Sequence, residues 1–195
     1  MTGDGKIRRV VTGHDKNGKA IVVSDGPATS VKTHPNRPGH RSTDIWKTTA
    51  MPVPISGAEP DPTHGARDFV PAMGTKLRIS EIPPEPPEFR NLTPDQAREF
   101  FKAGGNESAS TFRQGGRHPV MHRTESVDYA VVLEGEITML LDDQDVVLKA
   151  GDIVIQRGTN HAWSNRSGKP VRMLYVLIDG TFSPELASQF EVEKG

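Results

Sequence analysis

Two stretches in the second half of the chain carry the strongest signal for its fold: GGRHPVMHRTESVDYAVVLEGE at 115–136 and KAGDIVIQRGTNHAWSN at 149–165. The end of the first and the whole of the second lie in a region, 129–178, where short β-branched and apolar runs alternate with turn pairs such as Glu134-Gly135 and Ala150-Gly151. No helical pattern interrupts these runs. Closely spaced short strands of this kind predict an antiparallel barrel or sandwich.

The two stretches resemble the two sequence motifs of the cupin superfamily. The positions that keep the spacing of those motifs are Gly116, His122, Gly135, Gly151, Gly158, His161 and Asn165. The resemblance implies an all-β fold, a cupin-type antiparallel jelly-roll barrel, over residues 76–180. It does not extend to the residues before 76.

Three departures from the cupin motifs affect the chemistry. Thr124 stands where the second metal-binding histidine is usual, Asp128 replaces the usual glutamate, and Gln156 replaces a proline. The ligand set that the resemblance implies is therefore His122, Asp128 and His161. Two imidazoles and a carboxylate are typical of non-haem Fe²⁺ and also suit Zn²⁺ with a bound water. Mn²⁺ and Ni²⁺ are compatible with the same donors.

Simple geometry limits this ligand set. His122 and Asp128 are six residues apart, which is about 20 Å along a straight strand, so the chain must turn between them. Residues 124–126 are polar and suit such a corner. On the strand of His161, Trp163 shares the same face, so we expect Trp163 in the wall of a substrate pocket. We expect Thr124 there too, as a hydrogen-bonding or space-filling group.

Other interpretations of the same residues remain open. The two histidines suit a barrel interior in which they are hydrogen-bonded to neighbours. A buried Asp128 needs a cation, and Arg123, Arg157 or Arg172 could supply one instead of a metal ion. No catalytic residue is assigned, and His14, His34, His40 and His64 receive no role because their spacing is irregular.

The first part of the chain has a different composition. Residues 7–24 predict a β-hairpin around Asn17-Gly18. Twelve of the 16 prolines precede residue 90, and 25–74 is rich in Pro, Thr, His and Gly. We therefore expect three parts: a hairpin and irregular arm over 1–75 that packs on the barrel or on a partner subunit, the barrel over 76–180, and a C-terminal tail over 181–195.

One short helix is predicted, over Pro94–Ala103. Thr93 and Gln96 form the capping-box pattern, Pro94 suits the first turn, and Gly104-Gly105 ends the helix.

Composition excludes several classes of function. The 195 residues carry 24 Lys and Arg against 25 Asp and Glu, and there is no Cys. The balanced charge argues against nucleic acid or a membrane surface as a partner, and thiolate chemistry is excluded. No apolar run of signal-peptide or membrane-helix length occurs, so we expect a cytoplasmic protein. Exposed sheet edges favour a homodimer.

The expected function is that of a metal-dependent enzyme acting on a small oxygenated organic substrate. The leading hypothesis is a lyase or isomerase in which the metal acts as a Lewis acid. A non-haem Fe²⁺ dioxygenase is the first alternative. A barrel that binds a small molecule without converting it is the second.

Overall fold

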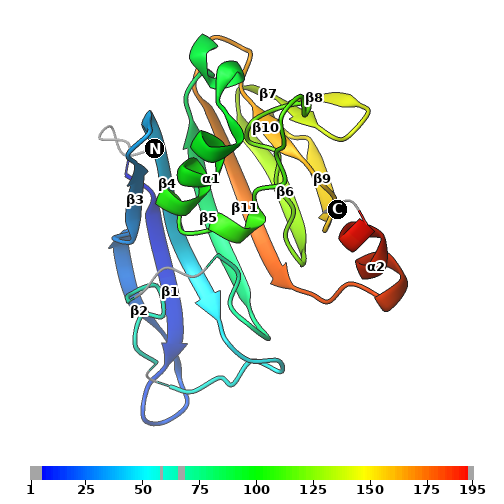
Figure 1. Ribbon diagram of the computed structural model, residues 1–195. Helices are drawn as coiled ribbons and strands as arrows, with labels where there is room; N and C mark the ends of the chain where they lie inside the picture. Colours follow the sequence, from blue (N-terminus) through cyan, green and yellow to red (C-terminus); the bar gives the residue numbers. More distant parts are fainter. Residues whose placement is uncertain (1–5, 58, 66–68, 193–195) are drawn as a thin grey trace.

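The computed structural model describes residues 6–57, 59–65 and 69–192, which form two antiparallel sheets and a separate hairpin (Figure 1). The larger sheet contains, in order, β3 (Val31–His34), β4 (Arg37–Thr48), β5 (Thr75–Ile82), β11 (Val171–Asp179), β6 (Ser126–Glu134) and β9 (Ile153–Arg157). The smaller contains β10 (Ala162–Ser164), β7 (Glu136–Leu140) and β8 (Asp145–Lys149). This arrangement confirms the all-β antiparallel fold class.

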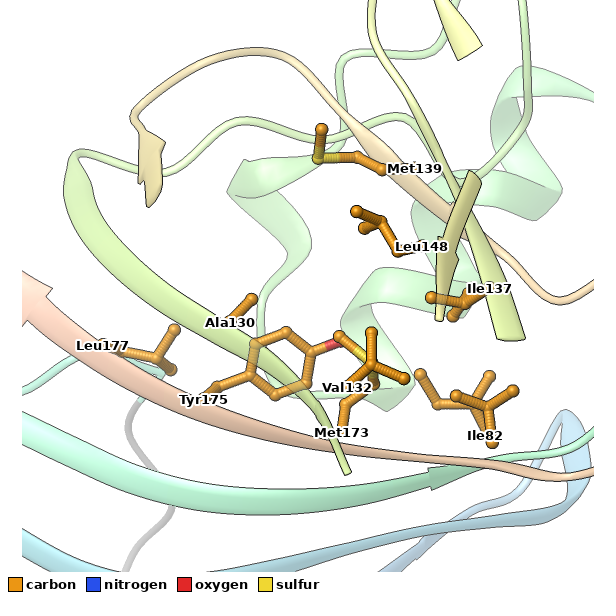
Figure 2. Close-up of a cluster of buried hydrophobic side chains, with 10 residues drawn as sticks. Ile82, Ala130, Val132, Ile137, Met139, Leu148, Met173, Tyr175 and Leu177 are labelled. Carbon is orange, nitrogen blue, oxygen red and sulfur yellow. The ribbon is translucent and has the colours of Figure 1, made fainter. Parts of the chain in front are cut away.

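The main hydrophobic core lies between the two sheets. Its buried members are Ile82, Ala130, Val132, Ile137, Met139, Leu148, Val171, Met173, Tyr175 and Leu177. Figure 2 shows the side chains of β7 and β8 opposite those of β6 and β11. Burial of one such large apolar side chain contributes roughly 1.5–3 kcal/mol, so this cluster holds the two sheets together.

The predicted N-terminal hairpin is confirmed. Strands β1 (Arg8–His14) and β2 (Ala20–Pro27) pair antiparallel. Gly18 adopts φ +77°, and Asp15 Oδ1 accepts the backbone N–H of Asn17 at 2.8 Å. The guanidinium of Arg9 donates to the carbonyl oxygen of Ile45 at 3.2 Å, which ties the hairpin to β4.

Strand β4 corrects the expectation that 25–74 is mostly irregular. It pairs with β5 along most of its length and extends the larger sheet. Its inward side chains are polar: Ser42 Oγ lies 3.3 Å from Ser80 Oγ, and Asp44 accepts a hydrogen bond from Arg78 Nε at 2.8 Å. Because these buried positions are not apolar, the sequence lacks the alternation that marks a half-buried strand.

Helix α1 (Pro94–Ala103) forms with its predicted boundaries and capping box. Thr93 Oγ1 accepts the N–H of Gln96 at 3.3 Å, and Gln96 Oε1 accepts the N–H of Thr93 at 2.8 Å. The helix buries Ala97 and Phe101. It lies in front of the larger sheet in Figure 1, where it covers the sheet's inward face. The short 3₁₀ helices η1 (Pro87–Asn91) and η2 (Glu107–Ala109) flank it.

The expectation of a single helix is wrong, because α2 (Pro184–Val192) forms within the segment expected to be a tail. Ser183 Oγ accepts the N–H of Leu186 at 3.3 Å at its start. Phe190 then packs against Phe182, and the guanidinium of Arg123 lies 3.6 Å from the centre of the Phe190 ring. These distant contacts stabilise a helix that its own sequence marks weakly. Neither α helix of the described chain is long and apolar enough to cross a membrane.

Candidate active site

A cavity of about 180 Å³ lies between the inward face of the larger sheet, helix α1 and the β3–β4 hairpin. Its aromatic and imidazole lining consists of His34, His40, Phe69, Phe100, Phe101, His122, His161, Trp163 and Tyr175. The Lys, Arg and Asp side chains in its lining are Lys32, Arg37, Arg78 and Asp128. A buried cavity of roughly 150 Å³ accommodates benzene, so this one suits a compound built on about one ring.

His122 and His161 are brought together by backbone hydrogen bonds. The N–H of His122 donates to the carbonyl of His161 at 2.8 Å, and the reverse bond is 2.9 Å long. The two rings lie 4.1 Å apart between centroids. Such an antiparallel bridge places two side chains next to each other from segments far apart in the chain. The two histidines that the motif spacing singled out are therefore adjacent in the structure.

Both imidazoles are oriented by their Nδ1 atoms. His122 Nδ1 lies 3.0 Å from the carbonyl oxygen of Val120. His161 Nδ1 lies 3.0 Å from the carbonyl oxygen of Thr159 and 3.0 Å from Gln156 Nε2. Both residues line the cavity. Burial lowers the pKa of both rings, and the neighbouring His122 lowers that of His161 further, so both are neutral at pH 7.

Asp128 lies on β6 with its side chain inside the molecule. The residue is 5% exposed, and Oδ1 has no hydrogen-bond partner among the described residues. Burial raises the pKa of the Asp128 carboxyl to about 6, against the lowering effects of a hydrogen bond with Ser126 and the charge of Arg78. A buried carboxylate with a free oxygen and a pKa near neutrality is suited to exchanging protons.

We tested these residues against the metal that the cupin resemblance implies. Nowhere in the described chain do three or more His, Cys, Asp or Glu side chains gather closely enough to hold a metal ion. Two of the three expected ligands, His122 and His161, are adjacent. Asp128 lines the same cavity, but the charged group that acts on it is Arg78, and the neutral phenol of Tyr175 lies nearby. The described residues thus do not fit a three-ligand centre.

The two expected pocket residues differ in position. Trp163 lines the cavity and makes edge contacts with His161 and with Tyr175, both at 5.7 Å between ring centroids. Thr124 lies outside the cavity lining. Its Oγ1 instead lies 2.9 Å from Ser126 Oγ, because the polar corner after residue 123 turns its side chain toward the start of β6.

Sequence reasoning missed the side of the cavity that the N-terminal region supplies. The His34 ring stacks on Phe100 with centroids 4.0 Å apart, and its Nε2 lies 2.9 Å from the carbonyl oxygen of Phe100. His34 and His40, which had received no role, thus line the cavity. One signal was available: Lys76, Arg78 and Ser80 occupy alternate positions of the segment that forms β5. That pattern indicates a polar interior.

A second polar cluster consists of Glu85, His118 and Ser164. Glu85 accepts a hydrogen bond from Ser164 Oγ at 2.7 Å, and His118 Nε2 lies 3.1 Å from its Oε2. Burial would raise the pKa of Glu85, but its contacts with His118 and Ser164 outweigh burial and lower that pKa to about 2. Glu85 is therefore ionised at neutral pH and links η1 to β10.

Comparisons with known proteins point to one family. The Cupin_2 family, described as a cupin domain, matches residues 110–177. "Phomopsin biosynthesis cluster protein D" of Diaporthe leptostromiformis is 46% identical over 82 residues, which cover 41% of this chain and 43% of that protein. "Cupin-domain-containing oxidoreductase fogC" of Aspergillus ruber is 29% identical over 186 residues, 92% of this chain and 75% of that one.

Among solved structures, the Schizosaccharomyces pombe Cnp3 cupin domain is 11% identical, covers 94% of each chain and has a TM-score of 0.42. The matched segments span less than half the length of the first two curated relatives, 43% and 35%.

Proposed function

Because the chain is a cupin-domain protein, with the domain at residues 110–177, we propose that it is an enzyme that moves a proton on a small, oxygen-bearing organic compound held in the cavity. The reaction class is an isomerisation or an elimination next to a carbonyl group. Asp128 is the proposed catalytic residue, and His161 is the proposed group that donates a hydrogen bond to the carbonyl oxygen.

The observation that carries this proposal is the free Oδ1 of Asp128. It is a buried acceptor without a partner among the described residues, on a side chain that lines the cavity. A carboxylate in that position takes a proton from a carbon next to a carbonyl group. The C–H electron pair then becomes the C=C bond of an enolate. Return of the proton to another carbon gives an isomer. Departure of a hydroxyl group from the carbon next to the enolate, protonated by the Asp128 carboxylic acid so that it leaves as water, gives an alkene conjugated with the carbonyl and restores the carboxylate.

His161 supports the same step. Because Gln156 Nε2 donates to His161 Nδ1 at 3.0 Å, the neutral His161 ring carries its proton on Nε2, which is suited to donating to a carbonyl oxygen on which negative charge develops. The backbone bridge and the Nδ1 contacts hold both rings in place before a ligand arrives. Preorganised dipoles of this kind act with less loss of energy than water, which must reorient.

The walls of the cavity favour an apolar ring. Phe101 and Trp163 line it, and the rings of His122 and His161 form a continuous series of ring contacts between them. The relatives support a substrate from small-molecule biosynthesis, because their names refer to the phomopsin and oryzine biosynthesis clusters. The substrate of each relative is a property of that protein, and for this chain only the broad class is proposed.

Deuterium exchange tests the proposal directly. The protein, freed of metal with a chelator, is incubated in D₂O with a panel of single-ring ketones and hydroxyketones, and the C–H signals are followed by NMR. We expect catalysed loss of the signal next to the carbonyl for at least one compound, and no catalysis by Asp128→Asn. Equal rates for wild type and variant, or no exchange across the panel, would contradict the proposal and favour a barrel that only binds its ligand.

A metal-dependent oxidoreductase is the second candidate function. It is favoured by the names of several relatives, "cupin-domain-containing oxidoreductase", and by the closeness of the His122 and His161 rings, whose centroids lie 4.1 Å apart. In this case His122 and His161 would hold a divalent ion, Fe²⁺ or Zn²⁺ first and Mn²⁺ or Ni²⁺ next, which would supply Lewis-acid or redox chemistry. Metal analysis of untagged protein separates the candidates: one equivalent that is lost in His161→Ala favours the oxidoreductase.

A further inference from the structure

Two arginines line the cavity without a full set of partners. Arg37 is 7% exposed and Arg78 is 5% exposed. Arg37 Nε and Arg78 Nη2 are both buried with no hydrogen-bond partner among the described residues. They come from different strands, β4 and β5, and both act electrostatically on the hydroxyl of Tyr175. Both guanidinium groups therefore line the same cavity and lie within electrostatic range of the same hydroxyl.

The chain itself neutralises these arginines incompletely. Arg78 Nε donates to Asp44 Oδ1 at 2.8 Å, but Asp44 also lies 3.8 Å from Lys76 Nζ, so one carboxylate serves two buried cations. No carboxylate of the described residues forms an ion pair with Arg37. Its Nη2 makes only a long contact, 3.5 Å, with the carbonyl oxygen of Pro83, and its guanidinium lies 5.4 Å from the ring of Phe89.

Burial makes this arrangement costly for the unliganded protein. A buried charge is normally paired or hydrogen-bonded throughout, and loss of solvation lowers the pKa of Arg37 accordingly, despite the opposing charge of Glu85. Guanidinium groups bind carboxylates through paired, planar hydrogen bonds. A carboxylate in the cavity would supply the acceptor oxygens that Arg37 Nε and Arg78 Nη2 lack.

We propose that the substrate carries a carboxylate group that binds to Arg37 and Arg78, attached to a ring that contacts Trp163 and Phe101. This inference rests on the proposed function and names its substrate class: ring-sized keto or hydroxy acids. Among the described residues, Asp128 is the one acidic side chain that lines the cavity, and the positive charge of Arg78 acts on it.

Matched acid and amide probes test the inference. Benzoate and benzamide have nearly the same shape, as do cyclohexanecarboxylate and its amide, and differ in charge. Binding is measured by calorimetry and thermal shift in a buffer without phosphate or acetate. We expect at least one acid to bind ten or more times more tightly than its amide. Equal binding within both pairs, or no binding by either acid, would overturn the inference.

Three variants assign the preference to residues. Arg37→Gln should reduce the acid preference at least tenfold, whereas Arg117→Gln, which makes the same change of net charge at a surface ion pair with Asp145, should keep it. An unchanged preference in Arg37→Gln would overturn the assignment. If Arg37→Gln does not fold, Arg37→Lys, which keeps the charge but not the paired geometry, should show a weaker preference.

Asp128→Asn distinguishes the two proposals. It should keep the acid preference while deuterium exchange is lost. Exchange that persists in Asp128→Asn contradicts the proposed function alone, and an absent acid preference contradicts the substrate class alone.

Discussion

Replacing Asp128 by asparagine should make the protein more stable at neutral pH while it loses activity. Burial raises the pKa of the Asp128 carboxyl to about 6 in the folded protein, whereas an unfolded chain holds an aspartate near its ordinary value of about 3.9. Folding therefore favours the protonated acid. Above pH 6 the folded state carries the full penalty of the buried charge, and below about pH 4 it carries none.

The size of the effect follows from the shift. About two pH units at roughly 1.4 kcal/mol per unit give a penalty of roughly 3 kcal/mol at pH 8. The neutral amide of asparagine removes it, which corresponds to a rise in Tm of roughly 6–12 °C for a chain of this length. The gain should shrink as pH falls from 6 to 4, because the wild-type carboxyl then takes up its proton.

Urea unfolding of chelator-treated protein between pH 4 and pH 8 measures this difference. We expect the unfolding free energies of wild type and Asp128→Asn to diverge as pH rises, with the variant more stable. Parallel curves over that range would refute the argument, since they would mean that Asp128 titrates in the folded state as it does in the unfolded state. Asp152→Asn is a suitable control, because Asp152 is exposed on the turn before β9.

Three further predictions concern stability and assembly. Glu85→Gln should destabilise the protein by roughly 3 kcal/mol at pH 7, because the pKa of Glu85 is lowered to about 2 in the folded state. In urea titrations the difference in unfolding free energy between wild type and variant should disappear as pH falls from about 4 to about 2. A full difference at pH 2 would contradict the prediction. Thr93→Ala removes the cap of α1 and should cost roughly 1 kcal/mol, seen as a Tm lower by about 2–4 °C, whereas an unchanged Tm would count against the cap. We also propose a homodimer through the edge strand β9, where Ile153 and Ile155 are exposed beside Tyr129. Size-exclusion chromatography at micromolar concentration should show a dimer for wild type and a monomer for Ile155→Lys. A monomeric wild type would exclude the proposal.

Sequence reasoning succeeded where one face of an element is apolar or a local cap is present. Strands β6 to β8 and β11 carry apolar side chains at the inward positions of the two-sheet core, and Thr93 with Gln96 marks the start of α1 within four residues. It failed at β4, because Ser42 and Asp44 point into a polar interior. It failed at α2, because Phe190 is held by Arg123, a residue far away in the chain.

The candidate site divides in the same way. Motif spacing found His122 and His161, and a backbone bridge joins the two segments that carry them. It found Asp128 as a buried carboxylate but not its neighbours, because Tyr175 lies on β11, next to β6, and Arg78 lies one strand further, on β5, an order that the sequence does not show. Arg37 lies in a region without apolar periodicity, so no local pattern could assign it to the cavity.

In the proposed function, Asp128 is a buried carboxyl group that takes up and releases a proton near neutral pH. Its titration can be followed directly by NMR through the ¹³C signal of the side-chain carboxyl in chelator-treated wild-type protein, assigned with Asp128→Asn. We expect the midpoint of the Asp128 titration at about pH 6. A midpoint at or below pH 4 would contradict it, because the carboxylate would then be too weak a base for the proposed step.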